Sequence, residues 1–215
     1  MKLYNLDNSP YASRVRIQIR HKQLPVTICD SPLLLRTPEF AAAYPLAKLP
    51  LLELDDGSHI AESTVILDYL EDVFPEPPLR PLEPLPRAHN GMLIRCADNH
   101  IAPALFPVFA EFLAPTGESA LREKFTAVEQ EIGKLEALLA SQPRRDNLQT
   151  GDIALATVFY FLEFFSKICD REAWLATNQQ VGTWWSRVLG FPAVAETIAE
   201  VDAAHLAFVA RVRGQ

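Results

Sequence analysis

The stretch AKLPLLELDDGSHIAES, residues 47–63, decides the fold of this chain. Within it, the apolar run Leu51–Leu54, the turn formers Asp55–Ser58 and the second run His59–Ala61 are typical of two strands joined by a tight turn. Beyond Ser63, apolar side chains recur at helical spacing, which predicts a helix with Ser63 as its N-terminal cap. The stretch therefore indicates a strand, a second strand and a helix in succession.

The residues before this stretch predict the alternating half of the same domain. Lys2–Leu6 has strand character, and Ser9 and Pro10 suit the cap and the first turn of a helix. A second strand is predicted over 26–29 and a short irregular helix over 37–44. The predicted order is β-α-β-α-β-β-α, an α/β domain.

Six of the 17 prolines fall between residues 75 and 86. A segment so rich in proline carries neither a helix nor a central strand, and it favours extended polyproline II geometry. We therefore predict a linker over residues 77–86, between a first domain of residues 1–76 and a second domain of residues 87–215.

The second domain has helical patterns and no strand pattern. A long helix is predicted over 87–112, bent or broken by Pro103 and Pro107, and an amphipathic helix over 119–139. The segment 152–168 is apolar on nearly every side, which is typical of a helix at the centre of a domain. The second domain is therefore expected to be all-helical.

The composition excludes several classes of protein. The chain has 215 residues, is 49% hydrophobic and carries a formal charge of −7, which argues against disorder and against a nucleic-acid partner. The first residues lack the apolar core of a secretory signal, and no apolar run is long enough to cross a membrane. Three scattered cysteines and five scattered histidines show no metal-ligand spacing. We therefore expect a cytoplasmic protein with reduced thiols, no metal site and no membrane partner.

Three segments carry a family resemblance. SPYASRVR, residues 9–16, is similar to the active-site turn of the serine-type, bacterial-like cytosolic members of the glutathione transferase family. Residues 47–63 resemble the family's glutathione-binding segment, and GDIALA, residues 151–156, resembles the start of its central helix. The resemblance implies a thioredoxin-like first domain that binds glutathione as a co-substrate, a helical second domain that forms most of the pocket for a small electrophile, and a homodimer. The implied enzyme is an alkyl or aryl transferase of the kind used in detoxification.

Ser9 is the predicted catalytic residue. A free thiol with a pKa of about 8.5 is only a few per cent thiolate at pH 7, and lowering that pKa by about two units requires about 2.7 kcal/mol in favour of the anion. A hydroxyl that donates to a charged acceptor supplies about 1.5–3 kcal/mol, and a helix N-terminus adds about 0.3–2 kcal/mol. One serine at the start of one helix is therefore sufficient. Asn8 and Ser13 are alternative donors, whereas Tyr4 lies within a strand and is not expected to act.

The resemblance also implies the rest of the glutathione site. Leu49-Pro50 resembles the family's cis-proline, where the N–H and C=O of Leu49 pair with the tripeptide backbone like an added strand. Glu62 is expected to accept from the ammonium of the γ-glutamyl group, and Ser63 with the helix amides is expected to bind its carboxylate. Lys48 would then face the glycyl carboxylate.

The second substrate leaves a weaker signal. The pocket for it is expected to draw on the first helix and on the long helix, with these candidates: Tyr11, Met92, Arg95, Cys96, Asn99 and Phe106. The basic residues Arg14, Arg16, Arg20 and Lys22 are more typical of a solvated helix face than of a surface that steers anions.

Conjugation of glutathione to a small hydrophobic electrophile is the expected function. One alternative is a non-catalytic glutathione-binding or interaction module with the same fold, because a fold does not fix an activity. Another is an isomerase, peroxidase or dehalogenase that uses the same thiolate. A cysteine-centred reductase is disfavoured, because no cysteine lies near Ser9.

Overall fold

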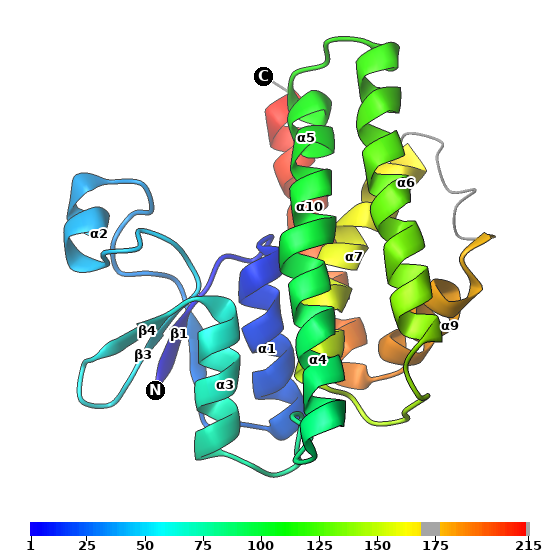
Figure 1. The fold of residues 1–215 in the computed structure, drawn as a ribbon. Coiled ribbons are helices and arrows are strands. Elements are labelled where there is room, and N and C mark those ends of the chain that lie inside the picture. The colour runs from blue at the N-terminus through cyan, green and yellow to red at the C-terminus, as the bar shows by residue number, and fades with distance from the viewer. Residues whose placement is uncertain (169–176, 214–215) are drawn as a thin grey trace. The chain divides into compact units, whose positions relative to one another are not determined.

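The structure is a computed structural model that describes residues 1–168 and 177–213 (Figure 1). The described residues form two compact units. The first comprises Met1–Leu79 together with the last helix from Glu196 on, and the second comprises Arg80–Ala195. The last helix from Glu196 on therefore belongs to the first unit, although it lies within the predicted second domain of residues 87–215.

A mixed sheet of four short strands forms the centre of the first unit. β1 (Lys2–Tyr4), β2 (Thr27–Cys29), β3 (Leu51–Glu53) and β4 (His59–Ala61) lie in the order β2-β1-β3-β4. β1 and β2 are parallel, while β3 is antiparallel to both of its neighbours. The parallel pair requires a crossover, which α1 (Pro10–Lys22) supplies, whereas β3 and β4 need only the predicted tight turn.

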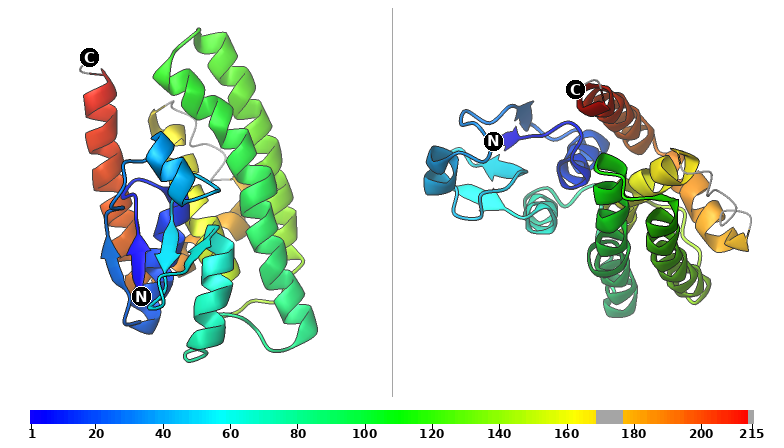
Figure 2. Two further views of the ribbon diagram at one scale, coloured as in Figure 1. Left: turned by 90° about the vertical axis from the view of Figure 1, so that its left-hand side faces the viewer. Right: turned by 90° about the horizontal axis from the view of Figure 1, so that it is seen from above.

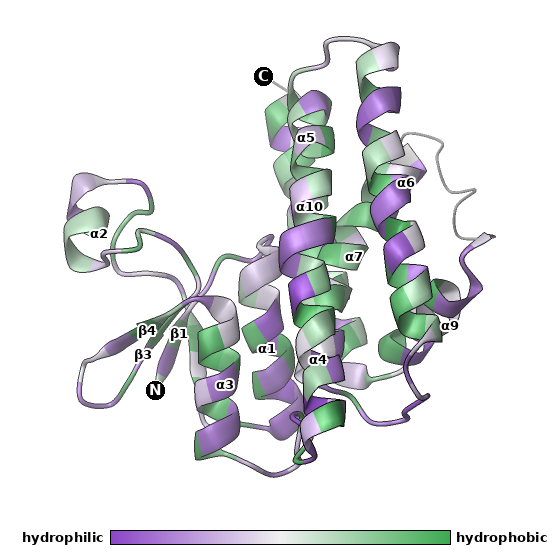
Figure 3. Ribbon diagram, viewed as in Figure 1, coloured by the Kyte–Doolittle hydropathy of each residue, from purple (hydrophilic) through white to green (hydrophobic). Residues whose placement is uncertain are grey.

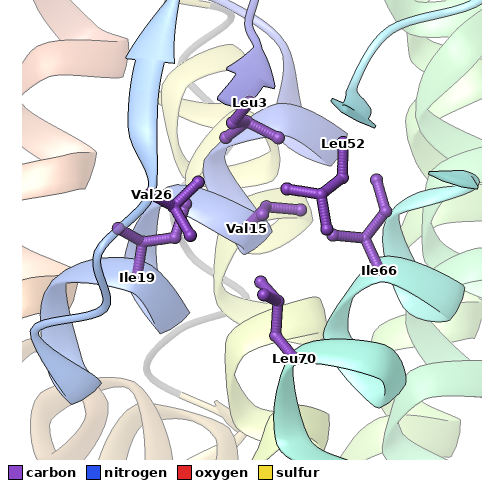
Figure 4. Packing of buried hydrophobic residues seen from close by; sticks show 7 residues of the cluster. All are labelled: Leu3, Val15, Ile19, Val26, Leu52, Ile66 and Leu70. Atoms are coloured by element: carbon purple, nitrogen blue, oxygen red, sulfur yellow. The ribbon is translucent and has the colours of Figure 1, made fainter. Parts of the chain in front are cut away.

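Helices cover both faces of this sheet. α1 and α3 (Ser63–Val73) lie on one face and α2 (Pro38–Ala43) on the other (Figure 2). Successive residues of a strand point to opposite faces, so Leu3 and Tyr4 belong to different cores. The core beneath α1 and α3 (Figure 4) contains Leu3, Val15, Ile19, Val26, Leu52, Ile66 and Leu70. The core beneath α2 contains Tyr4, Phe40, Tyr44 and Leu51.

The order β1-α1-β2-α2-β3-β4-α3 is the thioredoxin-like arrangement predicted from the sequence. One local prediction is wrong, because Ser63 is the first residue of α3 and not its cap. The cap position belongs to Glu62, whose side chain makes no capping hydrogen bond. The chain enters α3 through the left-handed backbone of Glu62, at φ 68°, so the helix begins one residue later than a serine cap would require.

The prediction that the basic residues of α1 form a solvated face is also wrong. Three of them are buried, namely Arg14, Arg16 and Lys22. Arg16 and Arg20 both bind the carboxylate of Glu200 in α10 (Pro192–Arg213), with N–O distances of 3.2 and 2.5 Å. Because α1 has the sheet on one side and α10 on another, its charged side chains find their partners inside the unit.

The second unit is all-helical, as predicted. It contains α4 (Pro84–Cys96), α5 (Ala102–Leu113), α6 (Glu118–Ala140), α7 (Thr150–Ile168) and α9 (Gln179–Leu189). α7 is buried along most of its length and packs against α4, α5 and α9, which confirms the predicted central helix. Hydrophilic residues interrupt the apolar residues along α6 (Figure 3), in keeping with its amphipathic pattern.

The long helix is continuous across its prolines. α4 begins at Pro84, three residues before the predicted start, because a proline in the first turn removes an N–H that has no helical partner. Ahead of Pro103 the helix widens into a π-turn, η1 (Ala97–Ile101), in which the N–H of Ala102 donates to the carbonyl of Ala97. A π-turn of this kind absorbs the irregularity that a proline introduces, and the helix then resumes as α5.

Two further features of the described residues concern membrane-spanning helices and groups of metal-binding side chains. Within residues 1–168 and 177–213, no helix is both long and apolar enough to span a membrane, and no three His, Cys, Asp or Glu side chains are grouped to hold a metal ion. Cys29 and Cys96 are free thiols. Cys169 lies outside the described residues.

Candidate functional site

Three segments that the sequence predicts to carry the site meet at one end of the sheet. Tyr4 pairs with Leu51, and Leu51 pairs with Ala61, so the end of β1, the start of β3 and the end of β4 lie side by side. The segments that follow or precede these three residues therefore share that end. They carry the predicted residues Ser9, Lys48, Leu49, Pro50, Glu62 and Ser63.

Ser9 caps α1 and keeps its hydroxyl proton available. Its Oγ accepts a hydrogen bond from the N–H of Ala12 at 3.3 Å. In the part of the chain that the structure describes, the Ser9 hydroxyl accepts this one hydrogen bond and donates none. α1 begins at Pro10, so the positive end of the helix dipole coincides with the hydroxyl. Ser9 is therefore able to donate to an anion at this end of the sheet.

The alternative donors are distinguished by whether their protons already take part in a hydrogen bond. The hydroxyl of Ser13 already donates to the carbonyl of Ser9, and its side chain is fully buried. Tyr4 donates to the carboxylate of Glu53, and that hydrogen bond raises the pKa of the phenol. Asn8 is half-buried in the loop before the helix. The geometry therefore leaves Ser9 and Asn8 as the available donors.

The peptide bond between Leu49 and Pro50 is cis, as predicted. Pro50 is buried and Leu49 is half-buried, immediately before the first residue of β3. Lys48 is exposed, so its ammonium is free to meet an anionic group in solution. A second cis bond, which the sequence analysis does not predict, joins Glu76 and Pro77 in the proline-rich segment.

Glu62 has an unusual backbone at φ 68° and ψ 117°. Conformations of this kind cost a non-glycine residue of the order of 1–3 kcal/mol and cluster at functional sites. Ser63 follows directly, is 5% exposed and opens α3. The N-terminus of α3 therefore offers a hydroxyl and unpaired backbone amides, which together suit a carboxylate.

Arg14 also lies at this site, although its sequence pattern predicts a solvated position. Its guanidinium is fully buried, and its Nη1 donates to the Oγ of Ser63 at 3.4 Å. The same guanidinium lies 4.9 Å from the centre of the Tyr11 ring. The sequence contains one indication that this helix is buried. The apolar residues Val15, Ile17 and Ile19 recur at every second position, so they lie on opposite sides of a helix. A helix with apolar residues on opposite sides is buried all round.

The candidates for the second substrate do not all lie together. Met92, Arg95, Asn99 and Phe106 recur at helical spacing on the exposed side of the long helix formed by α4 and α5. Cys96 lies on the opposite, buried side, where burial raises the pKa of its thiol to about 11. The helix therefore separates Cys96 from the other four.

Known proteins share this sequence pattern. The profile of the family described as glutathione S-transferase, N-terminal domain, matches residues 3–78. A probable glutathione transferase from Aplysia californica is 35% identical over 81 residues, which are 38% of this chain and 87% of that protein. A maleylacetoacetate isomerase from Pseudomonas aeruginosa is 34% identical over 95 residues, which are 42% of this chain and 45% of that protein. The chain spans about half the length of several curated relatives that it matches.

The likeness extends to a solved structure over nearly the whole chain. A glutathione S-transferase from Methylobacterium radiotolerans, crystallised in complex with glutathione sulfonate, is 28% identical with a TM-score of 0.72. The match covers 92% of this chain and 93% of the other. Both the sheet-containing unit and the helical unit thus have counterparts in one known architecture.

Proposed function

The chain belongs to the glutathione transferase family, and from this premise we propose that it joins the sulfur of glutathione to a small hydrophobic electrophile. Glutathione is then its co-substrate, bound on the first unit, and the enzyme is an alkyl or aryl transferase. We also propose that it acts in the cytoplasm as a homodimer, as the family resemblance implies.

The observation that carries the proposal is the hydroxyl of Ser9. It stands at the N-terminus of α1 with a proton that no described residue accepts. The strand register places the segment after β1 at the same sheet end as Leu49-Pro50 and Glu62-Ser63. A tripeptide held by the latter two segments would present its thiol near the start of α1.

Each part of glutathione has a complementary group in this arrangement. The γ-glutamyl ammonium would meet the carboxylate of Glu62, and the γ-glutamyl carboxylate would meet Ser63 and the first amides of α3. The backbone N–H and C=O of Leu49 would pair with the cysteinyl residue as an added strand does. Lys48 would meet the glycyl carboxylate.

The chemistry needs a thiolate and little else from the protein. The thiol gives its proton to water, and the Ser9 hydroxyl donates a hydrogen bond to the sulfur anion that remains. The sulfur electron pair then forms a bond to an electrophilic carbon. In a substitution the bond to the leaving group breaks and the group departs with its electrons. In an addition to an activated double bond, the neighbouring carbon takes a proton from water. The exposed side of α4 and α5, with Met92 and Phe106, would supply apolar contacts to the electrophile.

The experiment that tests the proposal measures the pKa of bound glutathione by the ultraviolet absorbance of its thiolate. A hydrogen bond to an anion is worth about 1.5–3 kcal/mol, so we expect Ser9→Ala to raise the thiol pKa by about one to two units and to slow conjugation by at least tenfold. An unchanged thiol pKa in Ser9→Ala would exclude Ser9 from this role.

Ser13→Ala is the matched control, because it removes a hydroxyl from the same helix whose proton is already donated to the carbonyl of Ser9. We expect it to leave the thiol pKa unchanged. Asn8→Ala tests the other available donor. A rise in the thiol pKa in Asn8→Ala alone would transfer the role from Ser9 to Asn8.

Isomerisation is a second candidate, favoured by the match to a maleylacetoacetate isomerase. In that case the thiolate would add to a conjugated double bond, allow rotation, and leave again, so glutathione would be regenerated. Product analysis distinguishes the two reactions, because conjugation consumes one glutathione for each product and isomerisation consumes none. Retention on immobilised glutathione without turnover of any electrophile would instead favour a binding module.

A further inference from the structure

The helical unit contains a pocket far along the chain from the residues discussed so far. It has a volume of about 320 Å³ and lies where the end of α6, the loop 142–146 and one face of α9 come together. This volume is at the lower limit of the range typical for small-molecule sites. Its walls are apolar at Leu139, Pro143 and Trp184 and polar elsewhere, and its polar residues include Arg144, Arg145 and Arg187.

The charge of the pocket is positive, although the chain as a whole is acidic. Arg145 and Arg187 form ion pairs with the same carboxylate, that of the fully buried Asp152, at 3.0 and 2.7 Å. Two guanidinium groups against one carboxylate leave one positive charge uncompensated in a partly buried place. Arg144 adds a further guanidinium on the exposed side, opposed only by the exposed Asp146 among the lining residues.

The wall also contains hydrogen-bond donors without acceptors. Within the described residues, two buried nitrogens have no partner here, Nε2 of Gln142 and Nε of Arg145. Gln142 accepts from Arg145 through its Oε1 at 3.3 Å, so this hydrogen bond leaves the amide nitrogen without a partner. Both unpaired atoms are donors, so the group that would complete them is an acceptor, and the excess charge specifies that it is anionic.

We propose that this pocket is a binding site for a small organic anion, with a phosphate, sulfonate or carboxylate group bound by Arg144, Arg145 and Gln142 and an apolar body placed against Trp184. Guanidinium groups bind such oxyanions in a planar, two-pronged manner, and the indole supplies a flat apolar surface. The site is separate from the glutathione site and does not depend on the proposed transferase activity.

The test is a calorimetric titration of the full-length protein with phenyl phosphate, in the presence of saturating S-methylglutathione so that the first site is occupied. Inorganic phosphate and benzyl alcohol are the comparison probes, the first without the ring and the second without the charge. We expect phenyl phosphate to bind more tightly than either and its affinity to fall as salt is added. The indole N–H signal of Trp184, assigned with Trp184→Phe, is expected to shift on binding.

Arg144→Gln tests the site without disturbing Asp152, because Arg144 is exposed and makes no ion pair with that carboxylate. We expect it to weaken phenyl phosphate binding about tenfold or more. Arg122→Gln, which removes an exposed arginine from the other end of α6, is expected to change the affinity less than twofold. Absence of binding, equal binding of benzyl alcohol, or equal losses in the two variants would overturn the proposal. Equal affinity for inorganic phosphate would overturn the assignment of an organic body.

Discussion

Arg14 contributes a buried positive charge beside the residue expected to hold a carboxylate. Its Nη1 lies 3.4 Å from the Oγ of Ser63, and its side chain has no exposed surface. A charge that assists a hydrogen bond is worth about 1.5–3 kcal/mol. We therefore expect Arg14→Met to weaken glutathione binding at least tenfold and to leave the pKa of the bound thiol unchanged. Calorimetry and thiolate absorbance measure the two quantities separately.

Arg14→Lys is the matched control for that variant. It keeps the positive charge but loses the rigid fork of donors, so it is expected to recover only part of the affinity. A role that is merely structural would lower the melting temperature without this graded effect. Wild-type affinity in a folded Arg14→Met protein would contradict the positioning role.

Asp152 stabilises the start of α7 through its buried carboxylate. Its carboxylate is fully buried and accepts hydrogen bonds from Arg145, Arg187 and Trp184. Removal of one partner from a buried ion pair costs about 3–5 kcal/mol, because the remaining charges lose their compensation. We expect Asp152→Asn to lower the free energy of unfolding by about this amount in urea. Asp146→Asn, in the exposed loop nearby, should change it by no more than about 0.5 kcal/mol.

At the scale of the elements, α4 and α7 approach each other closely at Gly151. A Cβ atom on Gly151 would lie 2.5 Å from the backbone oxygen of Asn90 and 2.7 Å from its Oδ1. The Oδ1 of Asn90 already accepts from the N–H of Gly151 at 2.7 Å, so the two helices are fixed at this distance. We expect Gly151→Ala to lower the free energy of unfolding by about 1–3 kcal/mol.

Gly133→Ala is the control for that substitution. Gly133 lies within α6, and a Cβ atom there would meet nothing within 4 Å. Alanine has the better helix propensity, so the free energy of unfolding is expected to rise by about 0.5–1 kcal/mol. If both variants are destabilised alike in urea, the close approach of α4 and α7 is not the cause.

The helices and strands could be predicted where the pattern of apolar and turn-forming residues lies within the element itself. The hairpin of β3 and β4, the amphipathic α6 and the buried α7 all follow from patterns within a few turns of chain. The π-turn Ala97–Ile101 could not, because its register shift leaves the apolar pattern of the long helix unchanged. β1 ends at Tyr4, two residues before its predicted end, because the chain then leaves the sheet toward α1.

The site was predictable to the extent that it consists of contiguous segments. The predicted cis bond at Leu49-Pro50 is present, and the strand register unites its segment with that of Glu62 and Ser63. Arg14 was missed because its burial arises from tertiary packing around α1. The same holds for Arg16, which pairs with Asp7 nearby and with Glu200, 184 residues away.

At the scale of the whole molecule, Glu53 in the first unit and Glu111 in the second make the stability of the fold depend on pH. A hydrogen bond from Tyr4 is the main cause that lowers the pKa of Glu53 to about 2, and one from Lys124 does the same for Glu111. A glutamate in an unfolded chain has a pKa of about 4.3, so between pH 2 and about 4.5 the unfolded state binds more protons. The contribution of Glu53 and Glu111 to the free energy of unfolding is therefore complete above about pH 5 and is lost as the pH falls toward 2.

Urea unfolding at a series of pH values between 7 and 2 measures this loss. We expect Glu111→Gln to be less stable than the wild type at pH 7 and to show a flatter decline toward pH 2. Glu118→Gln, at an exposed position in the same unit, should follow the wild-type curve. A Glu111→Gln curve parallel to the wild type throughout would show that Glu111 does not contribute to the acid sensitivity.

The first unit is discontinuous in sequence, since its first part ends at Leu79 and its last helix joins it from Glu196 on. A ribosome that adds about 5–20 residues per second needs roughly 6–25 s to pass from one to the other. During that interval Arg16 and Arg20 have been synthesised and Glu200 has not. Their ion pairs with Glu200 cannot yet form, so the unit that begins first during translation is completed only after the entire helical unit has emerged.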